Sequence, residues 1–157
     1  MDIKPISSEN RGQINEFIIS QWFSTDIVVR GELVDKTTLN GFVVFDDVSI
    51  IGLVTYRIDD NECEIISLDS LREKQGIGTV LINKVIEIAT KEKCTKLKLI
   101  TTNDNINALC FYQKRGFDMA HLYHNALDIS RRLKPSIPLL GDFGIPIKHE
   151  IEFEMKI

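Results

Sequence analysis

The chain has 157 residues, of which 43% are hydrophobic and 27% are charged, a composition typical of a folded globular protein. Its formal net charge is −4, so it lacks the excess of lysine and arginine that contact with many nucleic-acid phosphates requires. No apolar run approaches the roughly 20 residues of a membrane-spanning helix. We therefore expect one soluble domain over residues 1–157, with neither nucleic acid nor a membrane as its partner.

The cysteines indicate the compartment. Cys63, Cys94 and Cys110 are odd in number, show no Cys-x-x-Cys spacing and follow no signal peptide. We interpret them as reduced thiols, which predicts a cytoplasmic protein. No group of histidines, cysteines and carboxylates has metal-ligand spacing, so we expect no metal.

The first half of the chain predicts one helix and three strands. After Ser7 and Ser8, apolar residues recur at helical spacing as far as Trp22. Residues 41–45, 50–58 and 62–68 read as strands separated by aspartate-rich turns, and the three form an antiparallel meander.

The second half predicts a crossover between strands and helices. From Gly76 the apolar period becomes that of an amphipathic helix. A strand over 97–101, a short helix over 107–115 and a strand opening at Gly116-Phe117 follow. This order predicts an α/β crossover onto one sheet.

The last part of the chain is less regular. Residues 126–133 suggest a short helix that Pro135 ends, and a loop rich in proline and glycine follows to residue 146. In residues 150–155 three glutamates alternate with apolar residues, which predicts a final strand with one apolar face.

Two glycines carry the first chemical signal. Gly76 and Gly78 stand where a strand has ended and the amphipathic helix begins. A helix N-terminus has unpaired N–H groups and partial positive charge, and glycines let a phosphate approach the backbone. The pair predicts a seat for a pyrophosphate, with a tight turn packed on the sheet as the structural alternative. A dinucleotide fingerprint would need a third glycine where Leu81 stands, and the ending of a P-loop is also missing.

A second segment, residues 105–117, reads Asn-Ile-Asn-Ala-Leu-Cys-Phe-Tyr-Gln-Lys-Arg-Gly-Phe. Together with residues 67–79 it resembles the GNAT superfamily of acyl-CoA-dependent N-acyltransferases, matching the pyrophosphate loop and the Asn-x-x-Ala-x-x-x-Tyr-x-x-x-Gly-Phe signature. The resemblance covers roughly residues 40–123. It implies an α/β fold of the α+β type, with a mixed, mostly antiparallel central sheet of six to seven strands flanked by helices. It also implies acetyl-CoA as cosubstrate and a primary amine as acceptor.

The resemblance assigns roles to individual residues. Those expected to hydrogen-bond the pantetheine arm through their backbone are Leu68, Asp69 and Ser70. Those expected to hold the pyrophosphate are Gln75, Gly76, Ile77, Gly78 and Thr79. From the second motif come Asn105 and Ala108 along the cofactor arm and Tyr112 beside the sulfur. Where the family usually has Gln or Arg, three residues before the first glycine, this chain has Glu73, so Arg72 or Lys74 is expected to supply the charge.

The reaction requires an uncharged amine, although an ammonium group has a pKa near about 10.4. Backbone N–H groups near Leu68 would polarise the thioester carbonyl, and Tyr112 would protonate the leaving thiolate, so that attack is direct. Glu62 and Glu64 share one face of their strand, and either can serve as base. We rank Glu64 first because it is nearer the strand end, and a solvated hairpin face is the structural alternative.

Five further residues have two interpretations each. His121 and His124 are alternative bases or surface histidines. Trp22 and Phe23 belong to the core or border the acceptor pocket. Arg30 binds an acceptor carboxylate or is a plain surface arginine.

The sequence leaves a rival function and a long connection open. The rival is a non-catalytic acyl-CoA-binding sensor or partner module. The acceptor is a small-molecule or protein amine, and a homodimer remains open. Residues 124–147 join the last two strands by a longer connection than is usual in the family, and segments of this length are often functional. We expect residues 125–146 to form an ordered cap over the acceptor entrance, with a dimer contact as the alternative.

Overall fold

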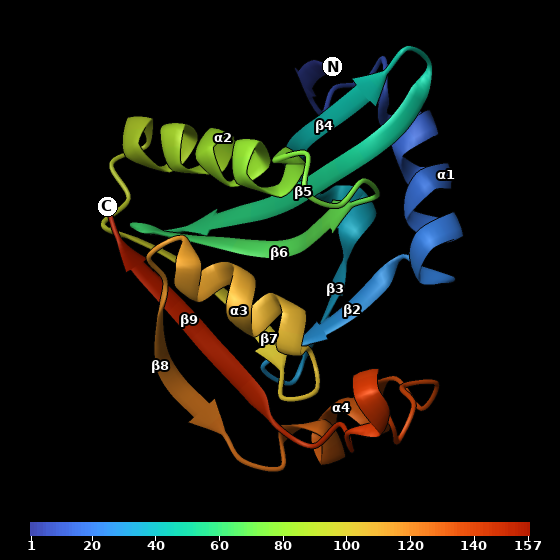
Figure 1. Cartoon of the computed structure of the whole chain (residues 1–157), viewed down its shortest axis with the longest axis vertical. Coiled ribbons are helices and arrows are strands. Elements are labelled where there is room, and N and C mark those ends of the chain that lie inside the picture. The colour runs from blue at the N-terminus through green and yellow to red at the C-terminus, as the bar shows by residue number, and fades with distance from the viewer. The chain divides into compact units, whose positions relative to one another are not determined.

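The computed structural model describes residues 1–157 (Figure 1). Its contacts divide the chain into two compact units. The first unit comprises Met1–Ile27, Asp35–Leu97 and Ile157. The second comprises Val28–Val34 and Lys98–Lys156. None of the helices combines the length and the apolar character needed to cross a membrane.

Four strands of the central sheet belong to the first unit. In spatial order they are β1 (Asp2–Pro5), β4 (Asn40–Asp46), β5 (Ser49–Asp59) and β6 (Glu62–Ser70). Each pairs with its neighbour in antiparallel fashion, which confirms the predicted meander. The helical elements of this unit are α1 (Arg11–Trp22), the 3-10 turn η1 (Lys36–Thr38) and α2 (Ile77–Lys91).

Helices α1 and α2 lie on opposite faces of these strands (Figure 1). Ile14 and Ile18 of α1 pack in one buried cluster with Leu53 of β5. The next residue back along β5, Gly52, faces the other way, where an added Cβ would meet a side-chain atom of Ile77 in α2 at 2.5 Å. Because successive strand residues point to opposite faces, β5 is covered on both sides. This explains its long, uninterrupted apolar run.

The second unit contains three sheet strands in the order β7 (Lys96–Thr102), β9 (Glu150–Lys156) and β8 (Asp118–Tyr123), with β7 starting in the first unit. Strands β8 and β9 are antiparallel. The helical elements are α3 (Ile106–Lys114), α4 (Ala126–Leu133) and the 3-10 turn η2 (Asp142–Gly144). Two further short strands, β2 (Asp26–Val29) and β3 (Glu32–Asp35), pair with each other. The predicted fold class, mostly antiparallel strands flanked by helices, is confirmed.

The first helix begins later than the sequence suggested. The main-chain carbonyl of Ser7 accepts hydrogen bonds from the N–H groups of Asn10 and Arg11, and the Asn10 side chain accepts one from the Ser7 N–H. Residues 7–10 therefore form a turn. At the other end, Phe23 has a left-handed backbone and is 91% exposed, so its assignment to the core was wrong.

The final strand also differs from its prediction. Phe153 is fully buried as expected, but Glu150 and Glu152 on the opposite face are only 2% and 5% exposed. The alternation of apolar and charged residues predicted the strand correctly, but it did not predict that two of its glutamates are buried. Hydrogen bonds from Arg30 and Ser130 to Glu150, and from Arg30 to Glu152, accompany this burial.

Candidate active site

The glycine loop of the first unit has the backbone that an anion seat requires. Gly76 is the N-cap of α2 with a φ of 74°, and Lys74 before it also has a left-handed backbone. No side chain caps this end of the helix. The N–H groups of a first helical turn have no intrahelical partner, so they can bind an anion. An added Cβ at Gly76 would meet no protein atom within 4 Å, so there is open space beside this glycine for an anion.

The side chains around this loop differ in exposure and in ion pairing. Arg72, one of the two expected cations, forms an ion pair with Asp46. Lys74 and Gln75 are exposed, whereas Ile77 and Gly78 are buried at the start of α2, next to half-buried Thr79. The Arg72 charge is therefore already balanced within the protein, which leaves Lys74 as the other expected cation.

Strand β6 contains a β-bulge just before the glycine loop. Tyr56 pairs with Ile65 but Thr55 pairs with Ser67, so Ile66 is an extra residue in the ladder. A bulge shifts the alternation of side chains by one. Ser67 consequently lies on the same face as Thr55, and their hydroxyls are 2.6 Å apart.

The bulge gathers the polar residues of β6 on one face. Glu62 and Glu64 pair with Asp59 and Arg57 before the bulge, and Asp69 pairs with Leu53 after it. Since Asp59, Arg57 and Leu53 alternate along β5 on one face, their partners share that face. Leu68 and Ser70 point the other way. Sequence reasoning placed Glu62 and Glu64 together correctly but could not bring Asp69 to them.

The two candidate bases have different surroundings. Glu64 is only 3% exposed, and its Oε2 accepts hydrogen bonds from Arg57 Nη2 and Nε at 3.2 and 3.3 Å. Glu62 is half-buried, and its Oε1 lies 3.0 Å from Lys96 Nζ. Glu64 is the carboxylate that is withdrawn from water and fixed in position.

A buried lysine that sequence reasoning missed adjoins Asp69. Trp22 Nε1 donates to both carboxylate oxygens of Asp69, at 3.1 and 3.2 Å. The Nζ of Lys36, a fully buried residue, lies 3.7 Å from the centroid of the Trp22 ring. Burial raises the pKa of Asp69, while the Trp22 hydrogen bond and the Lys36 charge oppose that rise. Trp22, at 37% exposure, thus orients a carboxylate on β6.

In the second unit, the Asn-x-x-Ala-x-x-x-Tyr motif forms helix α3. The Asn105 side chain caps this helix by accepting the Ala108 N–H at 3.2 Å. Tyr112 is 8% exposed and packs against the rings of Phe117 and Phe153, at centroid distances of 5.6 and 5.8 Å. The motif therefore sets the position of Tyr112 through a capped helix and an aromatic cluster.

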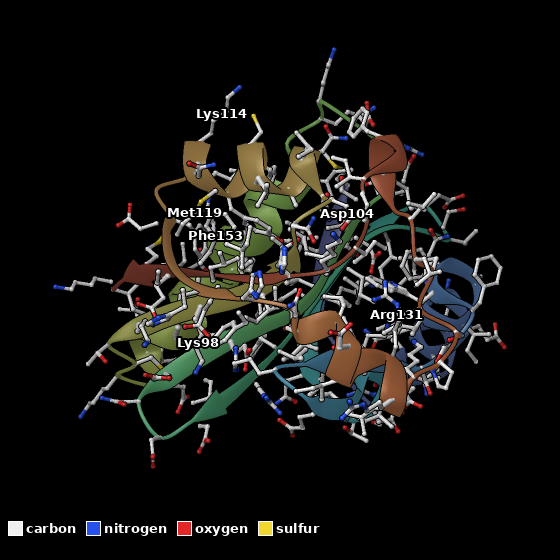
Figure 2. All side chains as sticks on the ribbon, turned by 90° about the horizontal axis from the view of Figure 1, so that it is seen from below. Lys98, Asp104, Lys114, Met119, Arg131 and Phe153 are labelled. Atoms are coloured by element: carbon white, nitrogen blue, oxygen red, sulfur yellow. The ribbon has the colours of Figure 1, made fainter.

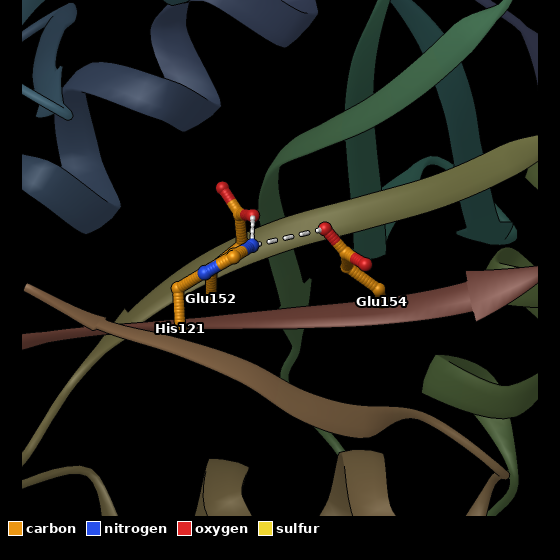
Figure 3. Close-up of side chains that lie close together, drawn as sticks. All are labelled: His121, Glu152 and Glu154. Atoms are coloured by element: carbon orange, nitrogen blue, oxygen red, sulfur yellow. Dashed lines mark ion pairs between the residues drawn. The ribbon is translucent and has the colours of Figure 1, made fainter.

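On the other face of β9 lies a charged cluster (Figure 3). Arg30 Nη1 is 3.0 Å from Glu152 Oε1, so Arg30 is not a plain surface arginine. His121 Nε2 lies 3.7 Å from Glu152 and 3.8 Å from Glu154. The His124 ring stacks on His149 instead, with centroids 4.7 Å apart.

The long connection after β8 makes hydrogen bonds within its own unit, and two residues that take part, Asp104 and Arg131, are labelled in Figure 2. Arg131 Nη2 donates to the carbonyls of Pro138 and Ile147, each at 2.7 Å. Asp104, just after β7, accepts the Asp142 N–H at 3.1 Å. The tip of the connection exposes three large apolar side chains, Leu139, Leu140 and Phe143. These hydrogen bonds connect the segment to its unit, and its role as an ordered cap stays a prediction.

A mostly antiparallel sheet, a bulged strand leading to a glycine-initiated helix, and a capped helix that carries a buried tyrosine together characterise an acetyltransferase fold. The chain belongs to the Acetyltransferase (GNAT) family, whose profile matches residues 10–117. It is 42% identical to YxbD of Bacillus subtilis (strain 168) over 152 residues, covering 96% of each protein.

Two further comparisons are more distant. Acetyltransferase PseH of Campylobacter jejuni (strain 81-176) is 30% identical over 112 residues, which cover 69% of this chain and 71% of PseH. The crystal structure of a GNAT family acetyltransferase from Elizabethkingia anophelis, with acetyl-CoA bound, has the same fold. It superposes with a TM-score of 0.70 at 20% identity, covering 99% of this chain and 97% of that one.

Proposed function

We propose that this protein is an N-acetyltransferase that transfers the acetyl group of acetyl-CoA directly to a primary amine. The observation that carries the proposal is the uncapped, glycine-initiated N-terminus of α2, which has open space in front of its first-turn N–H groups. Such a terminus favours a pyrophosphate. Membership of the acetyltransferase family and the acetyl-CoA complex of the Elizabethkingia neighbour support acetyl-CoA as the donor.

In this proposal, Gln75, Gly76, Ile77, Gly78 and Thr79 bind the pyrophosphate, assisted by Lys74. The backbone of Leu68, Asp69 and Ser70 binds the pantetheine arm beyond the bulge, together with Asn105 and Ala108. Glu64 accepts the proton of the acceptor amine, with Glu62 as the alternative. Tyr112 protonates the departing thiolate, and its packing against Phe117 and Phe153 fixes the ring for that step.

The test is a screen of primary amines with acetyl-CoA, in which release of free CoA thiol is measured. We expect thiol release that depends on an amine and stops in the absence of protein. The rival function, a sensor that binds acetyl-CoA without turnover, predicts calorimetric binding of acetyl-CoA and no thiol release with any amine.

A matched pair of variants then tests the general acid. Tyr112→Phe removes only the hydroxyl and should lower kcat by about 10²–10⁴, with little change in acetyl-CoA affinity. Lys114→Gln, at an exposed position of the same helix, keeps that hydroxyl and its ring contacts and should retain most of the activity. A wild-type kcat in Tyr112→Phe would remove Tyr112 from the mechanism.

A further inference from the structure

The long connection between β8 and β9 begins and ends at two stacked histidines. His124 directly follows β8 and His149 directly precedes β9. Their rings stack with centroids 4.7 Å apart and an interplanar angle of 17°. Both histidines and the whole connection belong to the second unit. The two ends of the connection therefore lie side by side at this pair.

One ring nitrogen of this pair is a hydrogen-bond acceptor. His149 Nδ1 accepts the main-chain N–H of Asn125 at 2.8 Å. A neutral imidazole has one acceptor nitrogen and one N–H group, whereas a protonated imidazole has two N–H groups and no acceptor. The hydrogen bond from Asn125 therefore requires neutral His149, in the tautomer that carries its proton on Nε2.

The hydrogen bond from Asn125 holds the start of α4. Asn125 is the N-cap of this helix, has a left-handed backbone with a φ of 57°, and makes no side-chain cap hydrogen bond. Further along, the Leu127 N–H donates to the carbonyl of Lys148 at 3.1 Å. Both bonds connect the start of α4 to residues 148 and 149, but only the bond to His149 depends on the protonation of its acceptor.

The backbone of residues 148 and 149 is fixed from the other side. Asn103 Oδ1 accepts the main-chain N–H groups of Lys148 and His149, each at 2.9 Å, and the Asn103 N–H donates to the His149 carbonyl at 3.1 Å. An asparagine amide does not titrate between pH 5 and 8, in contrast to an imidazole. The backbone of His149 is therefore held independently of the protonation of its ring.

We propose that His149 is a pH-sensitive latch at the base of the long connection, and that its protonation opens the start of α4. The imidazolium would carry an N–H group on Nδ1, so two donors would face each other where Asn125 now donates to an acceptor. Loss of this bond also removes a constraint that keeps Asn125 in the left-handed region, which is unfavourable for a residue with a side chain.

The charges around His149 favour its neutral form. Burial and the positive charges of His124 and Lys148 lower the pKa of His149. Two carboxylates belong to the adjoining elements: Asp128 in the first turn of α4 is exposed, and Glu150 of β9 accepts hydrogen bonds from other residues. Because the closed state requires neutral His149, the latch is closed at neutral pH and opens as the pH falls below about 6.5.

The latch is tested by NMR on the isotopically labelled wild-type protein without acetyl-CoA. The Nδ1 signal of His149 is titrated between pH 5 and 8, and the amide hydrogen exchange of Asn125 and Leu127 is measured at each pH. After correction for the intrinsic pH dependence of exchange, the protection of both amides should fall by up to about tenfold per pH unit below about 6.5. The Asp142 N–H, which Asp104 accepts further along the connection, should keep its protection.

A matched pair of variants identifies the group responsible. His149→Asn places a carbonyl oxygen near the position of Nδ1 and does not titrate, so the protection of Asn125 should lose its pH dependence. His124→Asn removes the stacked ring but retains His149, so the pH dependence should remain.

Three results in the wild type would each overturn the latch. They are a proton on His149 Nδ1 at pH 7.5, unchanged protection of Asn125 while His149 titrates, and an equal loss of protection at Asp142. Loss of the pH dependence in His124→Asn but not in His149→Asn would overturn it as well. Because these measurements use no acetyl-CoA, they decide on the latch whether or not the proposed function holds.

Discussion

Replacing Gly76 by valine should weaken pyrophosphate binding much more than it destabilises the fold. Gly76 has a φ of 74°, which costs a residue with a side chain about 1–2 kcal/mol. An added Cβ would meet no protein atom within 4 Å, so we expect backbone strain to be the main cost to stability. For a protein of this size, that strain should lower Tm by about 2–8 °C.

The effect on acetyl-CoA should be much larger than this strain. The side chain would occupy the space before the first-turn N–H groups of α2 and prevent at least one hydrogen bond to the pyrophosphate. A hydrogen bond to a charged group contributes about 1.5–3 kcal/mol, so affinity should fall by about 10- to 150-fold or more. Calorimetric titration of acetyl-CoA into the folded variant measures this loss directly.

Gly144 provides a matched control. It has a φ of 70°, and an added Cβ there also meets nothing within 4 Å. Gly144→Val should therefore show a similar loss of Tm with unchanged acetyl-CoA affinity. Wild-type affinity in folded Gly76→Val, or an equal loss in Gly144→Val, would refute the assignment of the pyrophosphate to this helix terminus.

Three further predictions follow from individual groups. Glu64→Gln should shift the pH–rate profile toward higher pH, and the same shift in Glu62→Gln instead would reverse our choice of base. Burial raises the pKa of Cys63 to about 12 and also raises that of Cys94, so native protein should expose only Cys110 to a thiol reagent, and a Cys110→Ser variant should be unreactive. Burial, with the nearby His124 and Lys148 charges, lowers the pKa of His149, whose Nδ1 accepts the Asn125 N–H. The unfolded chain then binds the proton more readily, so stability should fall as pH drops below about 6.5. In urea unfolding at pH 5 and 7.5, His149→Gln should show a smaller difference than the wild type.

The long elements were predictable from the sequence because each has a pattern that fills its length. Strands β5 and β6 and helix α2 have 11, 9 and 15 residues, long enough for an apolar run or an apolar period to be recognised. Strands β1, β2 and β3 have four residues each, too few to show a period, and β1 ends in a proline. Their existence depends on pairing partners, which the local sequence does not contain.

The backbone part of the site could also be predicted from the sequence, because glycine and asparagine, here Gly76 and Asn105, are common residues at helix N-termini. The bulge at Ile66 was not, because an extra residue in a ladder is defined only by the partner strand. Without it, the strict alternation of β6 would place Ile66 and Leu68 beside Glu64. With it, Asp69 replaces Leu68 on that face.

The partners of the buried charges also could not be predicted from the local sequence, although energetics require that such partners exist. Leaving a charge unpaired in the interior costs several kcal/mol, so a buried charge requires a partner. Here the partners come from distant parts of the chain: Arg30 reaches Glu152 across 122 positions, and Trp22 reaches Asp69 across 47. In the sequence, Glu152 is one of three alternating glutamates, which suggests a solvated face. The fold converts that face into a buried carboxylate that Arg30 and Tyr123 orient.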